Sequence, residues 1–120
     1  MSPTQRALKH LRAMGYQAQV VEKWNAFAKI RVDLFGCIDI VAVRPGVPVL
    51  GVQCTSHSNI SSRFAKSLVL GQGWLSTGHA QLEVWAFRKL KGHPTLQLDR
   101  RVIPLVDQQE AGNSRDCGSL

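Results

Sequence analysis

The chain has 120 residues, which suits one domain and is too short for two. Hydrophobic residues make up 44% and charged residues 19% of the chain, so the composition excludes a fully disordered protein, and no apolar run approaches the roughly 18 residues of a membrane span. Fifteen Lys and Arg residues outnumber eight Asp and Glu residues, and the net charge of +7 favours a polyanionic partner. Without an apolar span, no association with a membrane is expected.

The chain is predicted to begin with an amphipathic helix. Residues 2–5 (Ser-Pro-Thr-Gln) have the S-x-x-Q form of a capping box, with proline at the first helical position. Apolar residues then recur at helical spacing up to Met14, and Gly15 follows as a C-terminal stop. Residues 16–23 alternate weakly and predict a first strand, whereas residues 28–32 fit either a loop or a short strand.

The most apolar stretch of the chain lies at residues 37–43 (Cys-Ile-Asp-Ile-Val-Ala-Val). This nearly continuous, β-branched pattern is typical of a central strand that is covered on both faces. Pro45 and Gly46 suit the two central positions of a type II turn. Residues 49–55 are therefore predicted to return as the antiparallel partner.

A second helix is predicted from about Ile60, because residues 56–59 offer several N-cap candidates. This helix weakens at Gly71 and Gly73 and resumes for a few residues. Two later segments, at residues 82–89 and 96–103, have the pattern of strands.

The order of elements is therefore helix, three strands, helix and two strands. Such an order predicts a mixed sheet with helices on its faces, an α/β domain. We expect residues 1–106 to form this single domain. Residues 107–120 are polar, small and glycine-containing, and they predict a disordered tail.

The three cysteines, Cys37, Cys54 and Cys117, are odd in number and form no C-x-x-C pair. Neither a disulfide framework nor a zinc site is expected from them. Cys37 and Cys54 lie in apolar runs, where a thiol acts as a small buried hydrophobe. This cysteine usage fits a reducing cytoplasm.

The acidic residues of the first two-thirds of the chain cluster in sequence. From Met1 to Leu82 nine basic residues accompany only three acids, and these acids, Glu22, Asp33 and Asp39, fall within eighteen positions. Cations that hold phosphates and carboxylates that hold a metal ion are the two parts of a metal-dependent nuclease. Short strands can also carry scattered acids without any function.

The predicted hairpin carries three polar residues on otherwise apolar strands. Gln53 and Thr55 lie two apart and therefore share one face, and the turn can bring that end of their strand beside Asp39. Burying polar groups costs free energy unless they are paired or bind a ligand. The three polar residues therefore predict a ligand-binding or catalytic site at this end of the hairpin.

Residues 39–43, the Pro-Gly turn and residues 49–56 (Val-Leu-Gly-Val-Gln-Cys-Thr-Ser) resemble the PD-(D/E)XK nuclease superfamily. The order of elements is similar to the αβββαβ core of these enzymes, and the small size is similar to their Holliday-junction-resolvase-like branch. Residues 33–36 (Asp-Leu-Phe-Gly) also look like small phage and bacterial proteins of this type. The resemblance, over residues 4–103, implies a restriction-endonuclease-like fold. It further implies a Mg²⁺- or Mn²⁺-dependent endonuclease that cuts DNA, including branched DNA, and acts as a homodimer.

The resemblance assigns roles to the polar trio. Asp39 takes the place of the family's aspartate, Gln53 that of its second acid, and Thr55 that of its lysine. In the family, the carboxylates hold the metal ion and the lysine stabilises or activates the attacking water. Gln53 can offer a neutral amide oxygen and Cys54 its backbone carbonyl, which suits a hard cation. Thr55 cannot replace an ammonium charge.

Neighbouring residues could complete such a site. Glu22 or Asp33 would add an anionic ligand, and Lys66 or Arg63 would project a cation from the next helix, since the superfamily can relocate its lysine. His57 is a further candidate base. The remaining cations expected to contact DNA are Arg31, Arg88, Lys89, Arg100 and Arg101.

Other interpretations of the same residues stay open. Asp39 could cap a strand or bond a backbone amide, and Gln53 and Thr55 could be ordinary cross-strand partners. The basic residues of the last strands could guard a sheet edge against aggregation. The missing acid and lysine also fit a catalytically decayed nuclease fold that binds DNA or a protein. RNA binding by aromatic stacking is the least favoured, because the tryptophans are expected in core and rim packing.

Overall fold

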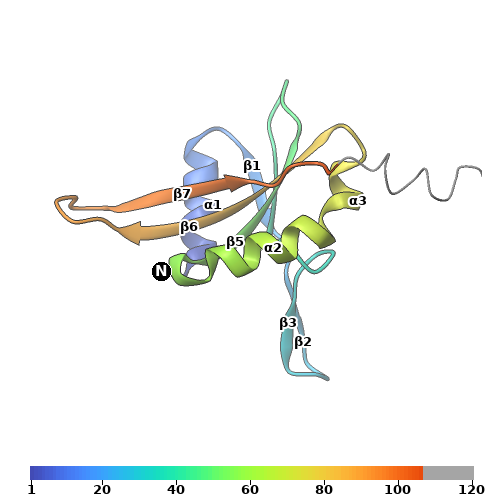
Figure 1. Cartoon of the computed structure of the whole chain (residues 1–120), viewed down its shortest axis with the longest axis horizontal. Coiled ribbons are helices and arrows are strands. Elements are labelled where there is room, and N and C mark those ends of the chain that lie inside the picture. Colours follow the sequence, from blue (N-terminus) through green and yellow to red (C-terminus); the bar gives the residue numbers. More distant parts are fainter. Residues whose placement is uncertain (107–120) are drawn as a thin grey trace, which may run out of the picture.

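The main sheet of the protein has five strands in the order β1-β4-β5-β6-β7, in a computed structural model that describes residues 1–106 (Figure 1). The strands are β1 (Gln17–Val20), β4 (Ile40–Val43), β5 (Val49–Ser56), β6 (Ala80–Lys89) and β7 (Leu96–Val102). Strands β5 and β6 are parallel, and all other neighbours are antiparallel. The predicted mixed α/β class is confirmed. The predicted tail at residues 107–120 lies outside the described residues.

Helix α1 (Pro3–Ala13) begins and ends as the sequence predicts. The Ser2 hydroxyl oxygen accepts a hydrogen bond from the backbone N–H of Gln5 at 3.1 Å, which satisfies one of the free donors of the first turn. The chain leaves the helix through Gly15, whose φ of +92° is a backbone conformation that glycine adopts without strain.

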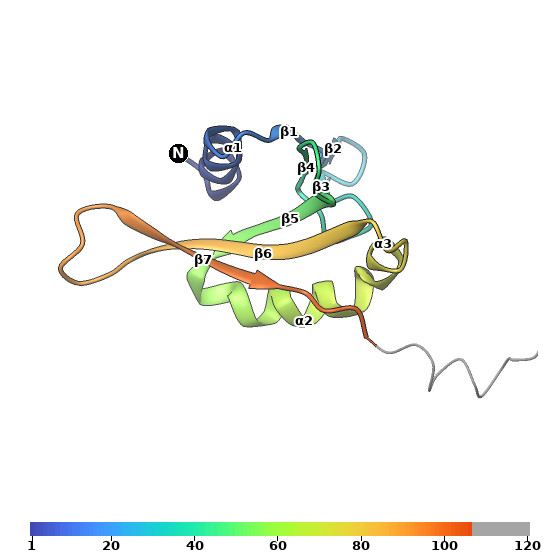
Figure 2. The same cartoon turned by 90° about the horizontal axis from the view of Figure 1, so that it is seen from above.

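Helices cover both faces of the sheet, so the fold has three layers (Figure 2). Helix α1 packs its buried leucines against one face, where Trp85 is the largest buried side chain. Helices α2 (Ile60–Leu70) and α3 (Gln72–Leu75), which follow the short turn η1 (His57–Asn59), cover the other face. Within residues 1–106, no helix has both the length and the apolar character needed to cross a bilayer.

The predicted hairpin of β4 and β5 is confirmed. Gly46 has φ +81°, and the N–H of Val47 donates to the carbonyl of Arg44 at 3.4 Å, as in a type II turn. The central strand of the sheet is β5, however, and β4 begins only at Ile40. Residues 34–38 instead form a tight loop, because Leu34 and Ile38 exchange two backbone hydrogen bonds of 2.9 and 3.0 Å.

The predicted single strand over residues 16–23 is wrong. The chain leaves the sheet after Val20 and forms a separate hairpin from β2 (Lys23–Asn25) and β3 (Ile30–Val32), which projects away from the sheet (Figure 1). The Asn25 side chain shapes its turn by accepting hydrogen bonds from the backbone N–H groups of residues 27 and 28. Trp24, expected in core or rim packing, is 58% exposed, because no helix covers this two-stranded hairpin.

The start of α3 provides a stability test. A Cβ atom built on Gly71 lies 2.2 Å from a methyl carbon of the buried Leu82, whereas a Cβ atom on Gly73 meets no atom within 4 Å. We expect Gly71→Ala to lower the free energy of unfolding by about 1–3 kcal/mol, because the core must shift. Gly73→Ala is the matched control and should be neutral or stabilising by up to about 1 kcal/mol. Urea unfolding of both variants measures this difference, and equal stabilities would contradict it.

A candidate metal centre beside the start of β4

The carboxylate of Asp39 occupies the point where β4 and β5 stop pairing. The paired residues of the two strands end at Ile40 and Val52, so the next part of β5 lacks β4 as a backbone partner. The Oδ2 atom of Asp39 accepts a hydrogen bond from the backbone N–H of Cys54 at 2.8 Å and another from Nε2 of Gln53 at 2.7 Å. Asp39 therefore bonds a backbone amide, as one open interpretation held, and is only 4% exposed.

Two further acids lie against Asp39. Glu22 follows β1 and Asp33 follows β3. The chain forms the β2–β3 hairpin between these two residues and then returns to the sheet, so both acids lie beside the sheet. One carboxylate oxygen from each of the three acids lies within 4.8 Å of the others. Within residues 1–106, the acids that cluster in sequence thus also cluster in space.

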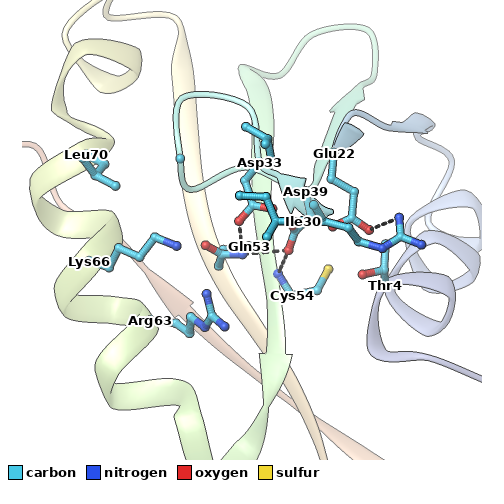
Figure 3. A pocket seen from close by; sticks show the side chains of 13 residues that line it. Thr4, Glu22, Ile30, Asp33, Asp39, Gln53, Cys54, Arg63, Lys66 and Leu70 are labelled. Carbon is cyan, nitrogen blue, oxygen red and sulfur yellow. Dashed lines mark hydrogen bonds and ion pairs between the residues drawn. The ribbon is translucent and has the colours of Figure 1, made fainter. Parts of the chain in front are cut away.

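These carboxylates line a pocket of about 490 Å³ between α2 and the start of the chain (Figure 3). Arg63 and Lys66 extend from α2 toward the carboxylates, and both side chains are half-buried. Within the described chain, neither of these two cations forms an ion pair. Arg31 also lines the pocket, but its guanidinium lies 3.6 Å from the Glu22 carboxylate. The pocket therefore holds acids on one side and unpaired cations on the other.

The environment of Asp39 favours its neutral form. Burial, followed by a side-chain hydrogen bond with Asp33, raises the pKa of this carboxyl to about 7, although the hydrogen bond from the Cys54 N–H acts to lower it. The charge of Glu22 acts in the same direction. A proton or a bound cation relieves the mutual repulsion of the three acids, so a cation must compete with protons for this site.

The Gln53 amide has a buried oxygen without a partner. The side chain is 1% exposed, and its Nε2 atom lies 2.7 Å from Asp39 and 3.4 Å from Asp33, while Oε1 has no hydrogen-bond partner in the described chain. The nitrogen, rather than the expected oxygen, faces the carboxylates, because carboxylates without a cation are strong acceptors. Rotation of the amide about its last bond would exchange the two atoms.

The structure places the remaining candidates around β5 differently. Thr55 is buried on the same face as Gln53, as predicted, but it does not line the pocket. Cys54 lines the pocket, and burial raises the pKa of its thiol far above the usual range, which leaves the sulfur protonated and a poor metal ligand. Its backbone carbonyl, and not the sulfur, stays the predicted ligand of this residue. The ring of His57 lies 3.4 Å from the Asp99 carboxylate, outside the pocket.

The cations of the last two strands do not reach the pocket. Arg100 donates two hydrogen bonds to the buried Glu83, at 2.8 and 3.1 Å, and stacks on Trp85. Arg101 pairs with Asp99 at 3.2 Å. Arg88 and Lys89 are exposed where β6 continues beyond β5. Only these last two present unpaired charge on the two strands.

Sequence reasoning missed the contribution of α1. Thr4 lines the pocket from the first turn of that helix, next to Cys54. No periodicity or spacing in the sequence could show that the helix starts beside β5.

The donor set of the pocket fits a hard divalent cation. Three carboxylates and one unpartnered amide oxygen are the ligands that Mg²⁺ and Mn²⁺ prefer. No family model matches the chain, and neither a curated protein nor a solved structure is significantly similar to it. Its function is therefore inferred from the geometry of this pocket.

The raised pKa of Asp39 makes stability depend on pH. The folded protein keeps the Asp39 proton up to about pH 7, whereas the unfolded chain releases it near the ordinary value of 3.8, so the free energy of unfolding falls as pH rises between these values. Asp39→Asn keeps an oxygen acceptor without the charge. At pH 8 without metal, it should be more stable than the wild type by about 2–4 kcal/mol.

This gain should disappear at pH 4, where Asp39 is neutral in the folded wild type. Guanidinium unfolding of both proteins at several pH values measures the difference. A difference that is the same at pH 4 and pH 8 would contradict a charge effect.

Proposed function

We propose that the chain is a metal-dependent endonuclease of the PD-(D/E)XK type that hydrolyses phosphodiester bonds in DNA. The observation that carries this proposal is the convergence of Glu22, Asp33 and Asp39 opposite the unpaired cations Arg63 and Lys66. Acids alone would repel a phosphate and cations alone would only bind it. Together they suit a bound metal ion and a phosphate in one pocket.

The topology supports the same proposal. Without the β2–β3 hairpin, the elements α1, β1, β4, β5, α2 and β6 follow the αβββαβ order, with three antiparallel strands and a fourth parallel to the third. Asp39 lies immediately before the second of these strands, and Gln53 lies on the third. Both positions agree with the resemblance to the restriction-endonuclease-like core.

In the proposed site, the acidic residues would bind the metal ion and the basic residues would bind the phosphate. The three carboxylates and the Gln53 amide oxygen would hold Mg²⁺ or Mn²⁺, which supplies Lewis acidity and lowers the pKa of a bound water. Arg63 and Lys66 would bind the phosphate oxygens and stabilise the extra negative charge of the transition state. Lys66 thus takes the part of the lysine that Thr55 replaces.

Hydrolysis joins one water oxygen to phosphorus and breaks one bond between phosphorus and a sugar oxygen. The water loses a proton to solvent, and the sugar oxygen gains one. The pocket must therefore admit water beside the phosphate, and its lining includes the solvent-exposed residues Ile30 and Arg31.

Two expectations accompany the proposal. The described residues hold one acidic cluster, so cutting both strands of a duplex would take two copies, as in a homodimer. The free thiols of Cys37 and Cys54 suit a reducing compartment such as the cytoplasm.

Cleavage assays test the proposal directly. Wild-type protein with Mn²⁺ should cut branched or single-stranded DNA, and Asp39→Asn should cut at least about 100-fold more slowly, because the metal loses a ligand. Lys66→Gln should slow cleavage as well, whereas the matched change Lys9→Gln on the exposed face of α1 should not.

Calorimetric titration of Mn²⁺ separates an enzyme from a decayed fold. Measurable binding that is lost in Asp39→Asn supports the proposed site. If the wild type binds DNA but neither binds Mn²⁺ nor cuts, the chain is a DNA-binding module, and the enzymatic proposal is wrong.

Gln53→Glu tests the amide at the position of the family's second acid. A fourth carboxylate should raise Mn²⁺ affinity by about tenfold, because a charged ligand replaces a neutral one. The same change should lower metal-free stability, since it adds a buried charge beside Asp39. Gln53→Met, which is similar in size and offers no oxygen, is the control. Equal Mn²⁺ affinities for the Glu and Met variants would contradict a ligand role.

A further inference from the structure

The segment that carries β2 and β3 exposes several aromatic rings. Trp24 is 58% exposed, Phe35 in the following loop is 62% exposed, and Phe27 at the hairpin tip is fully exposed. A single exposed apolar residue needs no explanation, but large aromatic rings gathered on one segment indicate a binding surface.

Trp24 and Phe35 line a second groove, of about 560 Å³, that adjoins the acidic pocket. The two cavities share Val32 and Asp33 as a common wall. Strand β3 lines the acidic pocket and strand β2 lines the groove, so the hairpin separates the two. A ligand that lies across this wall would occupy both.

The groove is held in shape before any ligand binds. Asn25 fixes the hairpin turn through two hydrogen bonds to the backbone. Phe35 has φ +55°, a left-handed conformation that is unfavourable for a bulky side chain, and its ring lies 6.3 Å from that of Trp74. Residues held in such sparsely populated backbone conformations cluster at active sites and ligand-binding loops.

The charges around the groove favour a nucleotide over an apolar peptide. Lys23 lines the groove beside Trp24, and Lys29 lies in the turn between β2 and β3. Arg31, although opposite Trp24 in the hairpin register, lines the acidic pocket and pairs with Glu22. An aromatic ring beside a cation matches the base and the phosphate of a nucleotide. An apolar peptide carries no negative group that could pair with these cations.

We propose that the groove binds an unpaired nucleobase of DNA, stacked on Trp24 and Phe35, while an adjoining phosphate lies in the acidic pocket. This inference rests on the proposed nuclease function and names its substrate class, DNA with an unpaired or easily unstacked base beside the cleaved bond. In an intact duplex the base must first leave its stack, which costs free energy. Single-stranded and branched DNA are therefore preferred over a continuous duplex.

Fluorescence of 2-aminopurine tests the stacking. A single-stranded oligonucleotide with one 2-aminopurine is titrated with the full chain carrying Asp39→Asn, so that cleavage does not interfere. Stacking on an aromatic ring should quench the emission. Adding Trp24→Ala should abolish the quenching and weaken binding about tenfold, the size of one lost base–aromatic stack. Trp24→Phe should restore most of the quenching and most of the affinity.

Val47→Ala is the matched control, because Val47 is an exposed apolar residue in the turn between β4 and β5, away from the hairpin. The chain with Val47→Ala and Asp39→Asn should bind the oligonucleotide and quench its emission as strongly as the chain with Asp39→Asn alone. A fully paired duplex of the same sequence should bind more weakly and respond little to Trp24→Ala. Unchanged quenching in Trp24→Ala, or equal losses for duplex and single strand, would overturn the proposal.

Cleavage by the otherwise wild-type chain separates this inference from the proposed function. If the protein cuts with Mn²⁺ but Trp24→Ala changes neither affinity nor cleavage, the stacking groove is wrong and the nuclease stands. If Trp24 governs binding but the wild type never cuts, the groove stands and the nuclease is wrong.

Discussion

The burial of one carboxylate where two strands separate is the constraint on which the site depends. Asp39 accepts from the backbone of Cys54 and from the side chain of Gln53, so both donors belong to β5. The register of β4 against β5 therefore sets the position of the pocket. A slip of one residue would turn Gln53 to the face that α1 covers and would separate it from Asp39.

The same arrangement opposes stability. A carboxyl with a pKa near 7, next to two other acids, weakens the metal-free fold at neutral pH. The two hydrophobic cores of the sheet must offset this cost. Groups that a fold would be more stable without are commonly kept for function, which agrees with a pocket that binds a cation.

Local chemistry predicted the elements with strong signals. The cap at Ser2 and the Pro-Gly turn each determine a boundary within a few residues of sequence. The proximity of Asp39 to Gln53 followed from that turn and from the two-residue period of a strand.

The rest depended on contacts between distant segments. Weak alternation over residues 16–23 continues through the end of β1 into β2, and no turn dipeptide marks the break. Trp24 is exposed because no helix packs over the β2–β3 hairpin. The residues around Trp24 in the sequence do not encode this. Likewise, the sequence predicts that Lys66 lies on the second helix, but only the packing of α2 directs its side chain toward the carboxylates (Figure 3).

The attachment of the β2–β3 hairpin to the sheet allows the hairpin to change without a change in the acidic residues. Lys23 and Val32, its first and last residues, are paired with each other, and the flanking Val20 and Ile40 are paired in the main sheet. Glu22 and Asp33 lie just outside the hairpin. Residues between Lys23 and Val32 could therefore vary in length or composition while the ends stay together and the acids stay in place. Under the proposed function, substrate preference could then diverge between related chains while Glu22, Asp33 and Asp39 stay unchanged.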